Sequence, residues 1–425
     1  MELDLDYEIP YKDGIEFSAL ALQDEDFAKF LKRNGQLDFS NQNAVMQLTK
    51  SLLKRDFGLH VSLPEDRLCP PVPNRVSYIV WIQGLLDSSN ISSRGTNISS
   101  RHVIGLDIGT GASCIYPLLG STMRPNWQFI ATEVDEKSLE FARANIELNN
   151  LESRIRLVKT DLQDSLLPLD YLACARIDFT MCNPPFFEST EDMLSSAKAK
   201  KKPPFTACTG SKGEMVTAGG EVAFVMRMID ESLMLKSRVQ WFTSMLGKRS
   251  SLAVIQSKLR EVGIENFAIT EFIQGSKTKR WAIAWSFDDW RPSFSVARGL
   301  QKVQKSSLPF PPEFYFMSTN DKFTLGERVN EILSKLCLQW QWDTQVLAGI
   351  GFSDKDVWSR AARRQNKSSV IVISNRDEKA FGFKIQIQEA SSEELSTKMT
   401  IRWLKGHDRV IFESFCGMMK RECSK

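Results

Sequence analysis

The residues best suited to chemistry are Asn183, Pro184, Pro185 and Phe186, which follow the apolar run IDF in the string MCNPPFF. The Asn183 side-chain oxygen and the Pro184 carbonyl can each accept one hydrogen of an adenine amine, which draws the nitrogen lone pair out of ring conjugation. The prolines fix both acceptors and bring no competing N–H. Phe186 or Phe187 can stack on a base pulled out of its helix or loop. The alternative is a strand-ending turn with apolar side chains.

A glycine-rich stretch, GLDIGTGASC (105–114), ends one predicted strand and opens a helix. Gly109 and Gly111 let the backbone turn tightly and approach a ligand, and the helix N-terminus can hold polar groups. The third glycine of the dinucleotide fingerprint is missing. Asp107, before the first glycine, suits an aminoacyl-adenosyl ligand better than a pyrophosphate.

Acidic residues end the next two predicted strands. Glu133, at the end of WQFIATEVD, is placed to accept both hydroxyls of a ribose. Asp161 ends the following strand, with Asp164 close behind, near where an adenine ring would lie. Together with Gly109 these residues favour a nucleoside-bearing ligand, and the alternative is a structural turn with a solvated acid.

The segments that position these residues alternate between short apolar runs and amphipathic helices from residue 102 onward. This alternation predicts βαβ units and a mostly parallel sheet covered on both faces. Only QGSKTK separates the last two strands, so a hairpin should add one antiparallel strand. The predicted strands are HVIGLDIG, WQFIATEVD, RIRLVKTD, RIDFTMCN, VQWFTSMLG, NFAITEFI and RWAIAWSF.

The pattern divides the chain into four parts. We predict a helical N-terminal extension over 1–100 and a Rossmann-like α/β domain over 101–290. A linker rich in Pro, Ser and Lys follows over 291–318. Alternating strands and a helix over 319–425 predict a small α+β domain with an antiparallel sheet.

Composition is that of an ordinary globular protein, with 42% hydrophobic and 25% charged residues among 425. The sequence holds no apolar run of about 18 residues, so no membrane-spanning helix is expected. The N-terminus lacks the features of a secretory signal. Eight scattered cysteines without C-x-x-C, and three histidines, predict reduced thiols and no metal site. The net charge of +3 does not by itself indicate a nucleic-acid binder.

Seven strings resemble the methyltransferase-like-sixteen family, the eukaryotic adenosine methyltransferases of the U-six spliceosomal RNA, which are akin to the bacterial ribosomal-RNA adenine methyltransferase F. The resemblance runs over about residues 25–290. The strings are RDFGL, VPNRVSYIVW, DIGTGASCIYPLLG, ATEVD, MCNPPFF, MLGKRSSL and TEFIQGSKTKRWAIAWSF. The resemblance implies S-adenosyl-L-methionine as donor, S-adenosyl-L-homocysteine as product, and the N6 amine of an adenosine in structured RNA as acceptor. That RNA would be a small nuclear RNA, with mRNA hairpins as an alternative, and the protein nuclear, with the cytoplasm left open.

The resemblance also implies roles for single residues. The stretch 183–186 matches the family's catalytic tetrad, and Arg75 matches an arginine that contacts the donor, where a guanidinium fork suits a carboxylate. Gly109, Ser113 and Glu133 match other donor contacts. The family's Lys-containing loop after the third strand is TDLQDSLLP here and has no Lys, and Asp164 could replace the family's Thr contact.

The resemblance further implies that the extension over 1–100 binds RNA. The family's substrate groove is basic, and Lys and Arg there would neutralise phosphates. For the run 198–202 the alternatives are a solvated loop and a weak nuclear import signal. The vertebrate members carry a kinase-associated-like C-terminal region that binds RNA, with which 319–425 is compatible; a dimerisation or packing domain is the alternative. The predicted RNA-binding residues are Phe187, Lys198, Lys200, Lys201, Lys202, Lys248, Arg249, Lys277, Lys279, Arg280, Arg363 and Arg364.

Two other functions remain open at this point. A protein glutamine methyltransferase needs the same acceptors for amide hydrogens, but the basic runs and a Phe where that class has Tyr speak against it. A donor-sensing RNA-binding factor would act mainly by binding.

Overall fold

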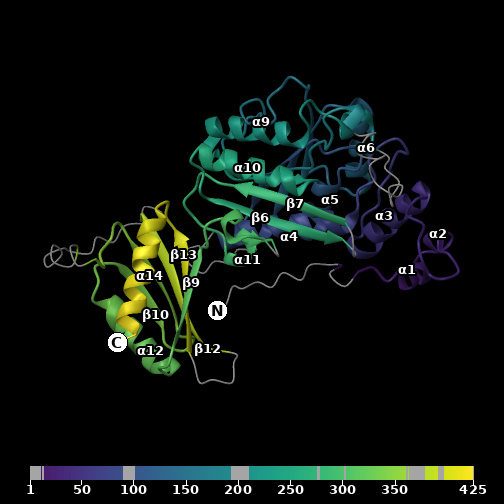
Figure 1. The fold of residues 1–425 in the computed structure, drawn as a ribbon. Helices are drawn as coiled ribbons and strands as arrows, with labels where there is room; N and C mark the ends of the chain where they lie inside the picture. The colour runs from purple at the N-terminus through teal and green to yellow at the C-terminus, as the bar shows by residue number, and fades with distance from the viewer. Residues whose placement is uncertain are drawn as a thin grey trace.

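A computed structural model describes residues 11, 14–89, 101–192, 210–274, 278–300, 303–359, 362, 379–390 and 397–424. Two sheets organise these residues, one of eight strands and one of five. Figure 1 shows the helices α1, α2 and α3 at one end of the molecule and the five-stranded sheet at the other, with the eight-stranded sheet between them. The predicted lysines 198, 200, 201, 202 and 277, and arginines 363 and 364, lie outside the described residues.

The eight-stranded sheet has the order β3-β2-β1-β4-β5-β7-β6-β8. Parallel pairing joins β3 through β5, whereas β7 runs antiparallel to both of its neighbours, β5 and β6. The predicted Rossmann-like sheet with one antiparallel strand is therefore confirmed. Its strands are β1 (Val103–Ile108), β2 (Trp127–Glu133), β3 (Ile155–Lys159), β4 (Ile177–Cys182), β5 (Val239–Leu246), β6 (Phe267–Gln274), β7 (Thr278–Trp285) and β8 (Arg298–Gly299).

Helices cover both faces of this sheet, which explains why every residue of β5 is buried. Consecutive residues of that strand, Trp241 and Phe242, pack into two different hydrophobic clusters because side chains alternate across a strand. The covering elements are α4 (Val72–Ser88), α5 (Ile115–Met123), α6 (Glu136–Leu148), α9 (Gly220–Leu235), α10 (Arg249–Glu261) and α11 (Phe294–Ala297). Short helices α8 (Lys212–Met215), η2 (Lys236–Arg238) and η3 (Lys305–Ser307) lie in connections.

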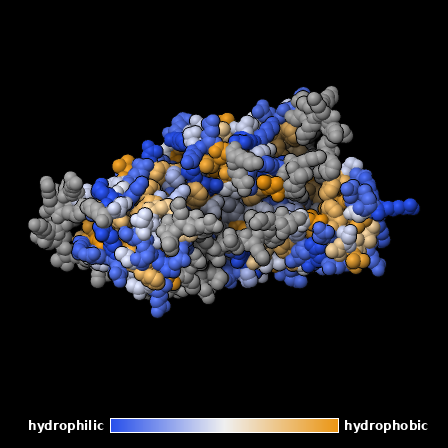
Figure 2. All heavy atoms as spheres, turned by 60° about the horizontal axis from the view of Figure 1, so that its bottom comes forward, coloured by the Kyte–Doolittle hydropathy of each residue, from blue (hydrophilic) through white to orange (hydrophobic). Residues whose placement is uncertain are grey.

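The N-terminal extension folds as α1 (Phe17–Gln23), α2 (Glu25–Ala28) and α3 (Gln42–Phe57). Asn41 begins α3 by accepting the N–H groups of Asn43 and Ala44, and Gly58 ends it at φ 65°. None of the described helices is both long enough and apolar enough to cross a bilayer. In Figure 2, apart from the grey atoms, hydrophobic residues form small groups among hydrophilic ones.

The second sheet has the order β10-β11-β12-β13-β9, and all its pairings are antiparallel, as predicted for an α+β domain. Its strands are β9 (Glu313–Ser318), β10 (Gln339–Asp343), β11 (Ala348–Ser353), β12 (Phe381–Glu389) and β13 (Thr397–Lys405), accompanied by α12 (Lys322–Ser334) and α14 (Arg409–Cys423). The expected linker 291–318 is wrong in its extent. Its end is the edge strand β9, and its beginning contains α11 and β8, which pairs with β6.

Arg291 joins the two sheets. Its Nε donates to the carbonyl of Gly406 at 2.9 Å, and its guanidinium lies 4.1 Å from the centre of the Trp403 ring. A salt bridge between Lys405 and Asp289 lies beside it. Because Arg291 and Lys405 are almost fully buried, the contact is a packed interface rather than a surface encounter.

Candidate active site

The strand register brings the three predicted polar strand ends together. Ile108 of β1 pairs with Thr132 of β2 and with Cys182 of β4. The next residue of each strand is therefore Gly109, Glu133 or Asn183. The glycine loop, the acid and the tetrad leave neighbouring parallel strands at the same edge, where ligands of open α/β sheets bind.

Glu133 fixes the glycine loop. Its Oε2 accepts the N–H of Gly111 at 2.8 Å, and its Oε1 accepts the N–H groups of Val134 and Asp135 at 2.9 and 3.0 Å. Gly109 and Gly111 have φ values of 69° and 66°, which residues with a Cβ rarely adopt. One buried carboxylate therefore fixes the backbone conformation of the glycine loop.

Asp107 is fully buried at the end of β1. Among the described residues, neither of its carboxylate oxygens accepts a close hydrogen bond, and the Thr110 hydroxyl is the nearest donor. Burial raises the pKa of Asp107 to about 7; the Thr110 hydroxyl opposes this rise, and the neighbouring Glu133 carboxylate adds to it. A buried carboxylate without a close donor is costly, so this group suits a cationic ligand such as an ammonium.

Arg75 of α4 supplies the positive charge of the same region. Its Nη1 donates to the Tyr116 hydroxyl at 2.6 Å and approaches the Met245 sulfur at 3.2 Å. The side chain is buried, and its Nε has no partner among the described residues. The remaining donor capacity suits an anionic group, for which a guanidinium is well shaped.

Asn183 follows β4 and carries a second orphaned acceptor. Its Oδ1 is buried and accepts no hydrogen bond from any described residue, while Pro184 beside it is buried. The strand end is supported by Tyr78, whose hydroxyl lies 2.6 Å from Thr243 Oγ1 and 3.5 Å from the Cys182 nitrogen. A free amide oxygen on a rigid backbone is available to hold an amine.

The two phenylalanines after the prolines are each approached by a cation. The Arg280 guanidinium lies 5.4 Å from the Phe186 ring centre, and the Lys248 ammonium lies 6.0 Å from that of Phe187. Burial lowers the pKa of Arg280, and the positive charge of Arg75 lowers it further. Arg280, predicted from the sequence as an RNA contact, is therefore mostly buried against the tetrad.

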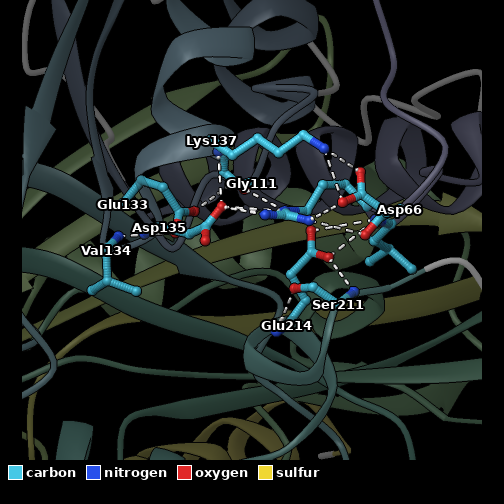
Figure 3. A network of polar contacts seen from close by, with 11 residues as sticks. Asp66, Gly111, Glu133, Val134, Asp135, Lys137, Ser211 and Glu214 are labelled. Carbon is cyan, nitrogen blue, oxygen red and sulfur yellow. Dashed lines mark hydrogen bonds and ion pairs between the residues drawn. The ribbon is translucent and has the colours of Figure 1, made fainter.

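Glu214 of α8 borders the glycine loop from the opposite side (Figure 3). Its carboxylate accepts the N–H groups of Ser211 at 2.7 Å and Leu68 at 3.1 Å. A Cβ on Gly111 would lie 3.7 Å from its Oε1. Burial raises the pKa of this carboxyl group. Helix α8 and the chain before α4 therefore close over the loop together.

A salt bridge holds the segment before α4 to the sheet. The Arg67 Nη2 lies 2.9 Å from Asp135 Oδ2, directly after the strand that ends in Glu133. Lys137 adds an ion pair with Asp66 at 2.8 Å (Figure 3). Within the described residues, no cluster of three or more His, Cys, Asp or Glu residues could hold a metal ion.

Other predicted residues lie further from these contacts. Asp161 and Asp164 are exposed, and the Asp164 carboxylate accepts the Asp161 N–H at 2.8 Å, which closes their own turn. Arg249 and Lys279 are exposed, and Lys279 pairs with Glu271 at 3.0 Å. The predicted donor contact Ser113 is buried in the loop before α5.

Sequence reasoning missed Glu214, Glu221, Tyr116 and Arg67. Each has a partner in the site that lies far away along the chain, such as Leu68 for Glu214 and Asp135 for Arg67, and no local spacing marks it. The one available signal in the sequence is a pair of glycines followed by an acid, GGE at 219–221.

The sheet order, the antiparallel β7 and the polar groups at the strand ends define a Rossmann-like methyltransferase. A family model described as RNA methyltransferase matches residues 6–289. The chain therefore belongs to this family of RNA methyltransferases, which confirms the predicted class of enzyme.

Two relatives show how far the similarity extends. The U6 small nuclear RNA (adenine-(43)-N(6))-methyltransferase of Schizosaccharomyces pombe is 40% identical over 394 residues, which cover 92% of this chain and 95% of that protein. The RNA N(6)-adenosine-methyltransferase METTL16 of Homo sapiens is 42% identical over 313 residues, covering 70% of this chain and 53% of the human protein. The chain thus spans about half of the human relative and nearly all of the yeast one.

Solved structures agree with these relatives. The catalytic domain of human Mettl16 in complex with the MAT2A 3′UTR hairpin 1 matches with a TM-score of 0.59 and 41% identity, over 66% of this chain and 94% of that one. The N-terminal domain of human METTL16 in complex with SAH matches with a TM-score of 0.54 and 39% identity, over 67% of this chain and 98% of that one.

Proposed function

We propose that this protein transfers a methyl group from S-adenosylmethionine to the N6 amine of an adenosine in U6 small nuclear RNA, and that it acts in the nucleus. The observation that carries the proposal is the buried, unpartnered Asn183 Oδ1 next to the glycine loop. The Schizosaccharomyces pombe relative, named for this reaction, supports the choice of RNA.

Several residues of the chain carry charges that complement those of S-adenosylmethionine and would bind this methyl donor. Asp107, which accepts no close hydrogen bond among the described residues, would accept from the donor's ammonium, and the free Nε of Arg75 would meet the donor's carboxylate. Glu133 would receive the ribose hydroxyls, and Gly109 and Gly111 leave room for the backbone approach. When bound, the donor would supply an electrophilic methyl group.

The tetrad would act on the acceptor. Asn183 Oδ1 and the Pro184 carbonyl each accept one amine hydrogen, which localises the nitrogen lone pair and orients it. Phe186 supports the adenine ring by stacking, and the nearby positive charge of Arg280 polarises the Phe186 ring. After transfer the methylated amine carries a positive charge and must lose one proton to solvent water, because the Asn183 amide oxygen and the Pro184 carbonyl accept hydrogen bonds but are too weakly basic to keep it.

The RNA backbone would lie along exposed cations near the tetrad. Lys248 and Arg249 follow β5 directly and are exposed, so they can neutralise phosphates. The human relative solved with MAT2A hairpins supports a structured RNA as the partner. We further propose that the sheet of β9 to β13 contributes a second RNA contact.

The test is the identity of the methylated nucleoside. Purified protein, labelled S-adenosylmethionine and a U6 transcript should yield N6-methyladenosine at one position after nuclease digestion and mass spectrometry. A transcript with that adenosine replaced by guanosine serves as the control and should remain unlabelled. Label in protein glutamine, or in no nucleoside at all, would contradict the proposal.

A further inference from the structure

Glu221, in the first turn of α9, is only 2% exposed. Its carboxylate points away from its own helix to the turn after β5. There Oε2 accepts the N–H of Gly247 at 2.6 Å and Oε1 accepts that of Lys248 at 3.0 Å. Hydrogen bonds from two backbone groups to one buried carboxylate are charge-assisted and hold the turn strongly.

The turn that Glu221 holds lies against the tetrad. A Cβ on Gly247 would meet Phe186 Cδ1 at 2.7 Å and Glu221 Oε2 at 3.2 Å. The ring of Phe186, the backbone of Gly247 and the carboxylate of Glu221 are therefore in mutual contact. Any shift of the turn would move the ring.

The start of α9 is tied to the tetrad by a second route. Phe187 donates its N–H to the carbonyl of Met215 at 3.0 Å, and its own carbonyl accepts the N–H of Thr217 at 3.0 Å. Gly220 lies so near that its added Cβ would be 3.5 Å from the Phe186 carbonyl oxygen. The segment before Glu221 and its carboxylate thus hold the tetrad from two sides.

Charge supports the same arrangement. Arg280 approaches Phe186 and is mostly buried near Arg75, so the two cations repel each other. The carboxylate of Glu221 opposes this repulsion and favours the charged form of Arg280. Removing the negative charge would leave Arg280 free to turn toward solvent, away from the ring.

We propose that Glu221 is a positioning residue for the acceptor base, because its carboxylate sets the turn at Gly247 and thereby the Phe186 ring on which the base stacks. The inference rests on the proposed function and adds a specific residue to it. It places Glu221 outside donor binding and makes it act on the RNA base through Phe186.

The experiment compares Glu221→Gln with a matched control on the same helix. Glu231 also uses its carboxylate to hold a loop, accepting the N–H groups of Leu166 and Leu167 at 3.2 and 3.0 Å, but it lies nearly three turns further along α9. Glu231→Gln therefore removes a similar interaction far from the tetrad. Gly247→Ala is a second variant: its Cβ crowds Phe186 most closely and the Glu221 carboxylate less closely, and it leaves the charge of Glu221 in place.

Two measurements separate positioning from general stability. The first is methylation of a U6 transcript, with kcat, KM for RNA and the donor Kd measured separately. The second is the fluorescence of the same RNA carrying 2-aminopurine at the methylated position. The Phe186→Ala variant gives the fluorescence expected when the base has no phenylalanine ring to stack on. Wild type must first be shown to form N6-methyladenosine, which tests the proposed function by itself.

We expect Glu221→Gln and Gly247→Ala to lower kcat by about 10- to 100-fold, because a displacement of about 1 Å costs on that order. Both should leave the donor Kd within about twofold and shift the fluorescence toward that of Phe186→Ala. Glu231→Gln should match wild type. With an active wild type, the inference would be overturned if kcat stayed unchanged in both variants. It would also be overturned if the 2-aminopurine fluorescence were the same with wild type and with Phe186→Ala.

Discussion

Asp107 should make donor binding depend on pH, and Asp107→Asn should remove that dependence. The carboxyl group is fully buried and accepts no close hydrogen bond among the described residues. Burial raises its pKa to about 7. The donor's ammonium stays protonated below pH 7 and favours the ionised carboxylate. The free protein must therefore release a proton before or as the donor binds.

The pKa sets the size of the effect. With a pKa of about 7, the ionised fraction in the free protein is about 3% at pH 5.5 and about one half at pH 7.0. The donor Kd should therefore fall by about 15-fold between these pH values.

The same pKa lies above that of the Asp107 carboxyl group in the unfolded chain. The contribution of this group to the free energy of unfolding therefore decreases as pH rises from about 4 to about 7.

Isothermal titration of the donor at pH 5.5, 6.0, 6.5 and 7.0 measures this slope directly. Titrations in two buffers of different ionisation enthalpy should show close to one proton released per donor at pH 5.5. Asp107→Asn should bind more weakly at pH 7.0 and show a flat profile, whereas Glu214→Gln should keep the slope of wild type. A flat profile in wild type, or an unchanged slope in Asp107→Asn, would refute the reasoning.

Three further predictions follow from single contacts. Gly111→Ala, at φ 66°, should weaken donor binding by roughly tenfold in titration, because a Cβ strains this left-handed conformation by about 1–2 kcal/mol; Gly58→Ala, at φ 65° in the end of α3, should leave donor binding unchanged. Lys248→Ala should weaken RNA binding and reduce the slope of log Kd against log salt by about 1 in anisotropy titrations, and an unchanged slope would exclude a phosphate contact. Arg291→Ala should lower the melting temperature, because it removes the ring contact with Trp403 and leaves buried carbonyl groups unpaired; equal melting of both proteins would contradict this role of the interface.

The sheet could be predicted from the sequence because each strand carries its own signal. Apolar runs alternate with helical periodicity from residue 102, and the short connection QGSKTK marks the antiparallel β7. A composition rich in Pro, Ser and Lys predicts a linker where strand β9 forms, and the pairing partner of β9, β13, lies about 80 residues later. An edge strand that depends on such a distant partner has no local pattern to show it.

The site could be predicted only in part, for the same reason. Gly109, Glu133 and Asn183 each follow a strand, so parallel pairing alone places them side by side. Glu221 and Arg280 owe their roles to packing against Phe186, which no spacing in the sequence encodes. The sequence predicts Arg280 as an RNA contact, and its burial against Phe186 follows only from the tertiary fold.

The central claim is that the Asn183 side-chain oxygen holds the acceptor amine. The most direct measurement is single-turnover methylation of a U6 transcript by Asn183→Ala, at saturating donor and RNA, with donor binding measured on the same sample. The account predicts a rate at least about 10²- to 10³-fold below wild type, because one preorganised hydrogen-bonding group is lost, with the donor still bound. A rate within tenfold of wild type, with the donor bound normally, would contradict it.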